Sequence, residues 1–392
     1  MKNLIELLIA WFALLFVFVG AYFSYYLYLR KALQRSWNIK IDKSNLPSVT
    51  IMVPVYNEER TIRLKLENLM KLIYPGEKLQ ILLVNDASSD RTLDEIASFS
   101  KSGYLDFTTV NLSQRSGKTK ALNKALERAK GDIIVVSDAD AFLPADALCI
   151  AMPYFADPSI GGVISQEALL DSGISWVSET ESLYMNLSYG TIKLGESKIH
   201  STLIFHGGFA AYRKSVLGHF NVEADDTGTA LDIVQKGNRT IMVPDVVSYS
   251  VEFANWKDKF DAKVRRARHN LNTWTRCLNL LLKRRLLLPK RIAVPEIFLY
   301  LFNPLIFLAL LILTVYFSIQ NLLFAGFLAL VIIQVLVVKK PRLLFVEVLQ
   351  NNFFLLLAIL GMIFRRDLIR WETSQDSRMI LNREMLERKG LV

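Results

Sequence analysis

Two long stretches without a charged side chain restrict most strongly what this chain can fold into. Residues 7–29 carry no charge, and neither do residues 297–338. A helix needs about 20 apolar residues to cross the ~30 Å hydrocarbon layer of a bilayer, so the first stretch suits one crossing and the second suits two. Because the residues between them are mixed in composition, we expect an integral membrane protein with a soluble middle.

A third apolar stretch, residues 343–364, is interrupted by polar side chains. Glu347 and the run from Gln350 to Asn352 lie inside it. Polar groups at membrane depth normally face a pore or the interior of a helix bundle. The sequence therefore leaves open whether this stretch spans the bilayer or is re-entrant.

The charge distribution indicates which partners the chain meets. The net charge is +10, and basic side chains gather beside the apolar stretches. That distribution favours membrane lipid headgroups as partners and gives no support to nucleic acid. Cys149 and Cys277 are too few for a disulfide framework, which agrees with a reducing compartment.

These signals predict a multi-pass protein of the plasma membrane with its middle in the cytoplasm and its amino terminus outside. The side of the carboxy terminus stays open. Three crossings after the middle would place it outside, whereas Arg365, Arg366 and Arg370 favour the inside.

Strands and helices are expected to alternate through the first part of the middle. The apolar runs that predict strands are residues 49–53, 80–84, 107–112 and 133–136, and helices are expected near 62–73, 92–96 and 117–131. Such alternation is typical of a doubly wound α/β sheet with right-handed crossovers. Neither the glycine pattern of dinucleotide-binding folds nor that of P-loops follows the first strand, so both classes lose support.

Beyond residue 161 the alternation is looser. Here we expect a helix over 175–194, a strand over 206–213, a helix over 225–237 and two short strands at 240–243 and 246–251. Residues 271–288 place Trp274, Leu278, Leu281 and Leu282 on one side, which predicts an interfacial helix.

Two carboxylates directly follow the fourth expected strand. Asp138 and Asp140 flank one alanine after the run from Ile133 to Val136. The loop at the carboxyl end of a buried parallel strand is where open α/β sheets hold ligands. Two carboxylates there suit a divalent cation that keeps room for phosphate oxygens. Alone, the pair is weak evidence, because such residues are more often solvated or cap a helix.

Further polar motifs follow the other expected strands in a fixed order. They are V-P-x-Y-N-E at Val53 to Glu58, an aspartate at Asp86, S-G-K-x-x-A-L-N at Ser116 to Asn123, the pair Asp225-Asp226, and a basic motif at Arg265 to His269. Taken singly, each of these residues fits a turn, a helix cap, a core side chain or a headgroup contact. Together, over residues 48–275, they resemble the inverting GT-A-fold glycosyltransferases of family 2, particularly membrane-bound cellulose, chitin and hyaluronan synthase-like enzymes.

The resemblance implies an α/β fold, in which a GT-A (Rossmann-like) nucleotide-sugar-binding domain is inserted between an amino-terminal transmembrane helix and carboxy-terminal transmembrane helices. The corresponding divisions are residues 1–30 for the anchor, 31–47 for a linker, 48–270 for the cytoplasmic domain, 271–292 for the interfacial helix, 293–364 for the carboxy-terminal membrane region and 365–392 for a charged tail.

The resemblance also implies roles for individual residues. Tyr56 would pack on the nucleobase, Glu58 would face the base or ribose, Asp86 would recognise the base and Lys118 would contact a phosphate or the base. The remaining donor-binding candidates are Pro54, Asn123, Asp138 and Arg266.

The other implied roles concern the metal, the catalysis and the acceptor. Asp140, with Asp138, would hold Mg²⁺ or Mn²⁺. Asp226, next to Asp225, would be the catalytic base, and Arg268 would contact the diphosphate. The acceptor-site candidates are Gly207, Gly208 and His269.

The basic motif departs from the family pattern at two positions. His269 stands where the synthases carry a tryptophan, and Arg265 replaces a glutamine. The departure weakens the case for processive polymerisation and leaves that for sugar transfer intact.

The sequence therefore predicts a metal-dependent, inverting hexosyltransferase that moves a sugar from a UDP- or GDP-sugar to an elongating poly- or oligosaccharide. A single transfer onto a lipid acceptor, such as a polyprenyl phosphate or a glycerolipid, is the alternative. An inactive nucleotide-sugar-binding scaffold is a third hypothesis.

Overall fold

The computed structural model describes residues 2–101, 103, 106–170, 176–251, 253, 255–364 and 375–392. Its largest element is an eight-stranded mixed sheet in the order β3-β2-β1-β4-β7-β6-β8-β5. The strands are β1 Val49–Val55, β2 Leu79–Asn85, β3 Thr108–Asn111, β4 Ile133–Val136, β5 Ala141–Phe142, β6 Ile160–Leu169, β7 Ala210–Arg213 and β8 Arg239–Ser250.

The first four strands along the chain pair in parallel, as expected from their apolar runs. The other half of the sheet is mixed: β7 runs antiparallel to β4 and β6, while β6 and β8 are parallel. The two short strands predicted at 240–243 and 246–251 are one strand, β8. Its register against β6 shifts between Ser165 and Gln166, so a bulge near Pro244 accommodates what the sequence suggested was a break.

Helices cover both faces of the sheet. They are α2 Ile62–Met70, α3 Thr92–Ser100, α4 Lys118–Leu126, α5 Ala147–Ala151, α8 Lys214–Leu217 and α9 Asp225–Val234, with short 3-10 turns at Gly76–Lys78 and Met152–Ala156. Along β1 the side chains alternate between the two cores. Ile51 and Val53 lie in one buried cluster and Met52 lies in the other, which is the two-residue period of a strand.

The helix predicted from residue 175 is longer than expected, although Ser175 itself lies outside the described residues. It comprises α6 Trp176–Leu187, a π-helical turn at Ser188–Lys193 and α7 Leu194–Ile199. The helix predicted near residues 92–96 is α3, which begins at Thr92, and neither Ser88 nor Ser89 caps it. Asp90 Oδ1 accepts the Thr92 amide proton instead, at 3.0 Å.

The predicted interfacial helix is instead part of a longer core helix. Helix α10, Trp256–Leu282, has 27 residues and buries Leu271, Trp274 and Cys277, whereas Leu282 is exposed. No proline or glycine interrupts residues 256–282, so the helix begins before the basic motif and carries that motif in its middle. The prediction of a separate element at residues 271–292 was therefore wrong.

Within the residues that the structure describes, three helices are long and apolar enough to cross a membrane: Leu4–Ala32, Lys290–Gln320 and Pro341–Ile363. The first lies in α1 Lys2–Ala32 and the third in α14 Lys339–Ile363. The second is continuous through α11 Lys290–Ile297, the π-helical turn Phe298–Phe302 and α12 Asn303–Gln320. Helix α13, Leu322–Val337, has 16 residues and is shorter than these.

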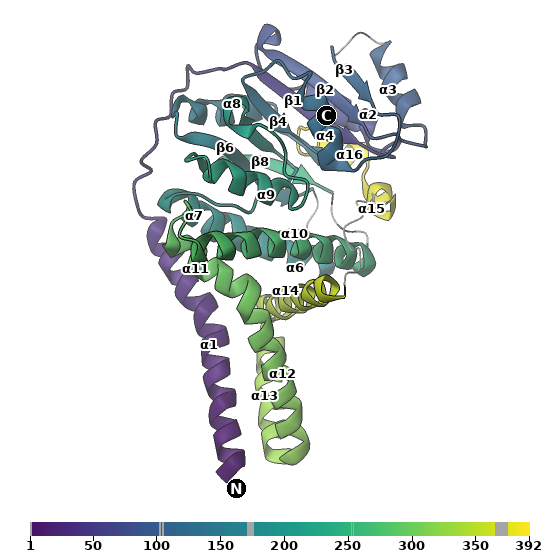
Figure 1. Ribbon diagram of the computed structural model, residues 1–392. Helices are drawn as coiled ribbons and strands as arrows, with labels where there is room; N and C mark the ends of the chain where they lie inside the picture. Colours follow the sequence, from purple (N-terminus) through teal and green to yellow (C-terminus); the bar gives the residue numbers. More distant parts are fainter. Residues whose placement is uncertain are drawn as a thin grey trace.

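Figure 1 shows how these helices are arranged. Helices α1, α12 and α13 extend together away from the sheet, and α14 lies across their upper end, next to α6 and α10. The stretch at 297–338 thus forms the expected pair of helices. The interrupted stretch at 343–364 lies in α14, which packs directly against α6 and α10 beneath the sheet.

Glu347, the charged residue within the apolar stretch of α14, belongs to a buried ionic cluster. Glu347 Oε2 lies 3.4 Å from Lys259 Nζ, and Lys263 Nζ lies 2.8 Å from Glu181 Oε2. All four side chains are at most 7% exposed, and they join α6, α10 and α14. Removing one partner of such a cluster leaves an uncompensated buried charge, so the cluster fixes α14 against α6 and α10.

The sequence predicted a charged tail over residues 365–392. The described part of this segment instead packs on the sheet domain. Residues 365–374 lie outside the described residues, but α15 Gln375–Ile380 and α16 Arg383–Glu387 are placed. Leu386 and Leu391 are buried with Phe142, and Asn68 Nδ2 donates to the Leu391 carbonyl at 2.8 Å. Two buried leucines in a short segment explain why its charges did not keep it in solvent.

This docking predicts the side of the membrane on which the chain ends. In a variant without Cys149 and Cys277, single cysteines at the exposed positions Glu77→Cys and Glu387→Cys should react alike with a membrane-impermeant maleimide, and only after cells are opened. A cysteine at Leu4→Cys, at the far end of α1, should react in intact cells. Labelling of Glu387→Cys but not Glu77→Cys in intact cells would contradict the docking.

Candidate functional site

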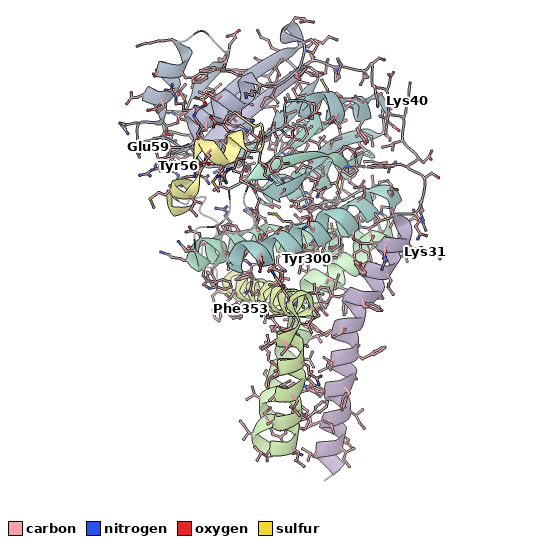
Figure 2. All side chains as sticks on the ribbon, turned by 180° about the vertical axis from the view of Figure 1, so that it is seen from behind. Lys31, Lys40, Tyr56, Glu59, Tyr300 and Phe353 are labelled. Atoms are coloured by element: carbon pink, nitrogen blue, oxygen red, sulfur yellow. The ribbon has the colours of Figure 1, made fainter. Side chains whose placement is uncertain are left out.

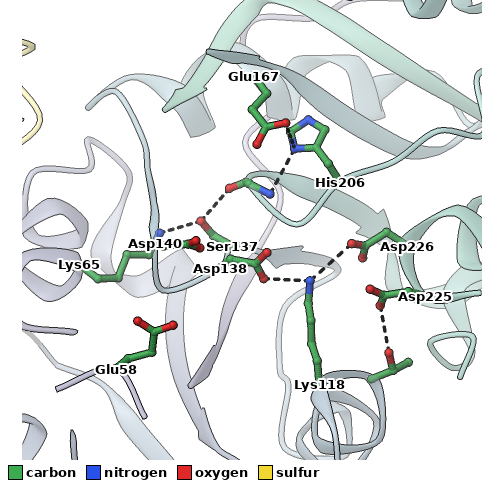
Figure 3. A network of polar contacts seen from close by, with 12 residues as sticks. Glu58, Lys65, Lys118, Ser137, Asp138, Asp140, Glu167, His206, Asp225 and Asp226 are labelled. Carbon is green, nitrogen blue, oxygen red and sulfur yellow. Dashed lines mark hydrogen bonds and ion pairs between the residues drawn. The ribbon is translucent and has the colours of Figure 1, made fainter. Parts of the chain in front are cut away.

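Three charged side chains from distant parts of the sequence meet at the carboxyl end of β4. Asp138 directly follows β4, Lys118 begins α4, and Asp226 lies in the first turn of α9. Lys118 Nζ lies 2.9 Å from Asp138 Oδ1 and 3.5 Å from Asp226 Oδ2, as Figure 3 shows. The structure thus brings together three of the residues that the sequence singled out.

Burial and mutual charge set the protonation of this group. Burial alone would lower the pKa of Lys118, but the Asp138 and Asp226 carboxylates raise it well above its ordinary value. Burial, and then the neighbouring Asp225 carboxylate, raise the pKa of Asp226 to about 7 against the opposing effect of Lys118. Asp226 is therefore poised to exchange a proton near neutral pH, which is the property of an effective general base.

Asp225 faces a different set of partners. Its backbone has a φ of +49°, and its Oδ1 accepts a hydrogen bond from Thr119 Oγ1 at 3.0 Å. Burial would raise the pKa of Asp225, but Lys118 and His269 lower it overall. The two adjacent aspartates therefore differ in protonation, because their environments push the two pKa values apart.

The two glycines of the small-residue segment line the Asp138 side of the site. Gly207 accepts the Asp138 amide proton at 2.8 Å, and a Cβ on Gly207 would overlap the Asp138 carboxylate and Lys118 Nζ. Gly208 accepts from Ser137 Oγ at 2.9 Å. A side chain at residue 207 would displace the ion pair, which explains a glycine there.

Asp86 organises the loop that carries Lys118. Its carboxylate accepts hydrogen bonds from Ser116 N at 2.7 Å, Ser116 Oγ at 2.9 Å and Gly117 N at 2.7 Å. Gly117 has a φ of +89°, a conformation that L side chains rarely adopt. Asp86 thus fixes the start of α4, and its expected role at the nucleobase remains a prediction.

Lys65 is a residue that the sequence analysis missed. It is fully buried on α2, where its Nζ donates to Ser137 Oγ at 2.7 Å and to the Ala141 carbonyl. Burial lowers its pKa to about 7, opposed by Asp138 and Asp140. Lys65 therefore ties down the Asp138–Asp140 loop from beneath. Its signal was a lysine within the apolar stripe of Ile62, Leu66 and Leu69.

The contacts of Ser137 continue to a buried histidine, as Figure 3 shows. His206 Nε2 lies 3.0 Å from the Ser165 carbonyl, and its Nδ1 accepts the Gly208 amide proton at 3.2 Å. Burial lowers the pKa of His206 to about 4. His206 is therefore a neutral imidazole with its proton on Nε2, and it supports Gly208 as a packing residue.

Asp140 and Glu58 share a partner from the far end of the chain. Arg378 of α15 donates from Nη1 to Asp140 Oδ2 at 2.6 Å, and from Nε and Nη2 to the two Glu58 oxygens at 2.9 and 2.7 Å. Burial would raise the pKa of Asp140, but Arg378 lowers it overall. No local pattern marks Arg378, because 238 residues separate it from Asp140.

Several expected donor residues are engaged elsewhere. Both ends of the Asn123 amide bond the backbone of Phe220, at 2.9 and 2.7 Å, so its contacts give no support to a role at the donor. Pro54 is buried inside β1. The Arg115 guanidinium lies 4.0 Å from the centre of the Tyr56 ring, so one face of that ring is covered by an arginine.

The arginines of the basic motif on α10 have different charged neighbours. Burial and the neighbouring Arg266 lower the pKa of Arg265. The Asp225 and Asp138 carboxylates oppose this effect. Glu167 and Glu181 raise the pKa of Arg266 against the effect of burial. Arg268 Nε and Nη1 are shielded from solvent and have no hydrogen-bond partner among the described residues.

These placements change which basic groups serve the site. His269 and Arg265, four residues apart, lie on the α10 face near Asp225. Arg265 therefore joins Lys118 among the basic groups near Asp225 and Asp138. The role of Arg268 at the diphosphate stays a prediction.

The Asp138 and Asp140 carboxylates fit a divalent cation whose remaining ligands come from a bound nucleotide or water. Within the described residues, no group of three or more His, Cys, Asp or Glu side chains is placed to hold a metal ion. Asp138 and Asp140 present carboxylate oxygens from one loop. Such a pair suits Mg²⁺ or Mn²⁺ when the cation is also bound by phosphate oxygens.

Comparison with known proteins relates part of the chain to a family. Residues 50–220 match the family model described as Glycosyl transferase family 2. Among solved structures, the chain resembles the mannosyltransferase PcManGT from Pyrobaculum calidifontis in complex with GDP-Man and Mn²⁺. The TM-score is 0.79 and the identity 29%, over 92% of this chain and 100% of that one. The predicted fold is therefore confirmed.

Curated relatives match shorter parts of the chain. Poly-beta-1,6-N-acetyl-D-glucosamine synthase of Staphylococcus aureus (strain COL) is 29% identical over 51% of this chain and 49% of its own length. Beta-monoglucosyldiacylglycerol synthase of Synechocystis sp. is 34% identical over 36% of this chain and 30% of its own length. The matched region thus spans half or less of these relatives.

Proposed function

We propose that this chain, which carries a glycosyltransferase family 2 domain of the GT-A fold, is a membrane-bound, metal-dependent, inverting hexosyltransferase. The observation that carries the proposal is the Lys118 ion pair with Asp138 and Asp226 at the carboxyl end of β4. That site places one carboxylate with a pKa of about 7 next to a fixed positive charge.

In this proposal Asp226 accepts the proton of an acceptor hydroxyl while that oxygen attacks the anomeric carbon of the donor. The bond to the nucleoside diphosphate breaks on the opposite face, so the anomeric configuration inverts. Lys118, freed from part of its ion pairing by the incoming diphosphate, stabilises the charge that develops on the leaving group. A divalent cation on Asp140 and Asp138 would neutralise further charge on the diphosphate.

The donor is a UDP- or GDP-sugar in this proposal. GDP-mannose is the first candidate, because PcManGT is described in complex with GDP-Man and Mn²⁺ and matches this chain over nearly its full length. The synthase relatives keep UDP-sugars in the panel to be tested.

The acceptor lies at the membrane face, since α10 joins the site to the helices beneath it. An elongating saccharide is one candidate, in keeping with the polysaccharide synthase relative. A lipid acceptor gains support from the packing of α1 against α12, where Trp11, Phe18 and Phe307 fill the space between the helices. A polymer-exporting enzyme would need a lined channel through such a bundle.

The predicted cytoplasmic orientation in the plasma membrane belongs to the same proposal, since nucleotide sugars are then within reach of the site. It is supported by the basic residues that flank the apolar helices.

Nucleotide release from the full-length protein in nanodiscs tests the proposal. We expect release from one of a panel of UDP- and GDP-sugars, with Mg²⁺ or Mn²⁺, in the presence of either an oligosaccharide or a lipid extract. Asp226→Asn should lower turnover about 10²–10⁴-fold, the usual contribution of a general base, with donor affinity retained. The exposed change Asp94→Asn on α3 is the matched control.

Each arm of this assay has a distinct meaning. A requirement for lipid extract assigns the lipid acceptor, and a growing product without it assigns the saccharide. Full turnover in Asp226→Asn would remove Asp226 as the base. Donor binding without turnover under every condition would replace the enzyme with the scaffold hypothesis.

The raised pKa of Asp226 predicts a pH dependence. Because the base must be deprotonated, the rate should rise as pH increases through about 7. Asp225→Asn removes a negative charge that raises this pKa, so it should move the acid limb to lower pH. The measurement is kcat against pH for both proteins. An acid limb that stays in place or moves upward would contradict this electrostatic account.

A further inference from the structure

The carboxy-terminal segment reaches the predicted cation site. Figure 2 shows α15 and α16, in yellow, beside the labelled Tyr56 and Glu59, which follow β1. From α15, the Arg378 guanidinium contacts Asp140 at 2.6 Å through Nη1 and Glu58 at 2.7 and 2.9 Å through Nη2 and Nε. One side chain thus joins both carboxylates.

The burial of these groups makes the contact more than a surface ion pair. The Glu58 side chain is 2% exposed and that of Arg378 is 10% exposed, whereas Asp140 remains 28% exposed. The planar guanidinium engages Glu58 with two parallel bonds, the strong arrangement for arginine and carboxylate. The third contact, to the more open Asp140, is the one that a competitor from solvent can reach.

A divalent cation and Arg378 make opposing demands on Asp140. A guanidinium does not lose its proton in a protein, so it keeps its positive charge beside any cation bound to the same carboxylate. Like charges that share one carboxylate at such short range repel each other strongly in a partly buried site. Binding of a cation at Asp140 therefore weakens the contact with Arg378, and the reverse holds equally.

The rest of the segment is anchored separately from Arg378. Leu386 and Leu391 are buried, Arg383 pairs with Glu67, and Asn382 caps α16 by accepting the Met385 amide proton at 3.0 Å. These contacts lie after residue 381. Helix α15 can therefore leave the site while α16 stays attached.

We propose that Arg378 is a built-in occupant of the cation site, which competes with the divalent cation for Asp140 and holds α15 over the donor site until cation and nucleotide bind. Cation loading then releases Asp140 from Arg378 and frees α15, while α16 keeps the segment on the domain. This inference rests on the proposed function, because it takes Asp140 as the cation ligand.

Binding of Mn²⁺ to full-length protein in nanodiscs, followed by the EPR signal of free Mn²⁺ in the presence of GDP or UDP, tests the competition. Arg378→Gln should bind Mn²⁺ about tenfold more tightly, the scale of one charge-assisted hydrogen bond. Arg383→Gln, which removes an ion pair of α16 away from Asp140, should leave the affinity unchanged. Asp140→Asn should abolish the Mn²⁺ binding measured with the nucleotide.

Hydrogen exchange supplies a second measurement that does not depend on turnover. In the unaltered protein, Mn²⁺ with nucleotide should speed exchange in residues 375–381 and leave residues 383–392 unchanged. In Arg378→Gln, residues 375–381 should exchange fast in both conditions. Should this variant fail to fold because Glu58 is left buried and unpaired, the double variant Glu58→Gln with Arg378→Gln removes both charges and serves in its place.

The outcomes separate this inference from the function on which it rests. Unchanged Mn²⁺ affinity in Arg378→Gln would overturn the competition. Weaker affinity would instead make Arg378 a donor-binding residue, and exchange in 375–381 that ignores Mn²⁺ and nucleotide would also overturn the proposal. None of these results removes the transferase, which fails only if nucleotide release and its dependence on Asp226 fail.

Discussion

One ammonium group held between two carboxylates organises this molecule. Lys118 is placed by the Asp86-bound loop at the start of α4, Asp138 by the end of β4, and Asp226 by the first turn of α9. Each element reaches this point only if the sheet is assembled, and Gly207 must lack a side chain for the three to meet. The pairing of these charges stabilises them inside the protein. Burial and the Asp225 carboxylate raise the pKa of Asp226 to about 7, against the opposing effect of Lys118.

The site is also tied mechanically to the apolar helices. On helix α10, the face of Arg265 and His269 lies toward Asp225, while Lys259 and Lys263 enter the buried ionic cluster with Glu181 and Glu347. A movement of α14 would therefore act on the helix that carries Arg265 and His269 beside Asp225. In the proposed function, this coupling links the transfer site to the apolar helices beneath it.

Local signals in the sequence predicted much of the sheet and the site. Each parallel strand combines an apolar run with a polar residue near its end, so the strands and the positions of Asp86 and Asp138 beside them could be predicted. The order of the strands in the sheet was not predicted. Family resemblance predicted the GT-A fold, which is confirmed. Asp225 and Asp226 alone suggested only a helix amino terminus, and the structure adds their contacts with Thr119 and Lys118.

What the sequence could not reveal depends on distant contacts. Asn123 fitted a donor-binding motif, yet both ends of its side-chain amide form hydrogen bonds with the Phe220 backbone. Arg378 looked like one charge in a surface tail, because nothing near it indicates that Asp140 and Glu58 are its partners. The sequence predicted a helix only from residue 271, after the basic motif, whereas α10 begins at Trp256 and buries Lys259 and Lys263 in ion pairs with distant glutamates.

The anomeric configuration of the product tests the central claim most directly. The claim is a single displacement in which Asp226 takes the proton of the acceptor while the acceptor attacks the sugar. An α-linked nucleotide-sugar donor should therefore give a β-linked product, measured by NMR from the one-bond coupling between C1 and H1. An α-linked product would contradict the account, because it requires either two displacements or attack from the face of the leaving group.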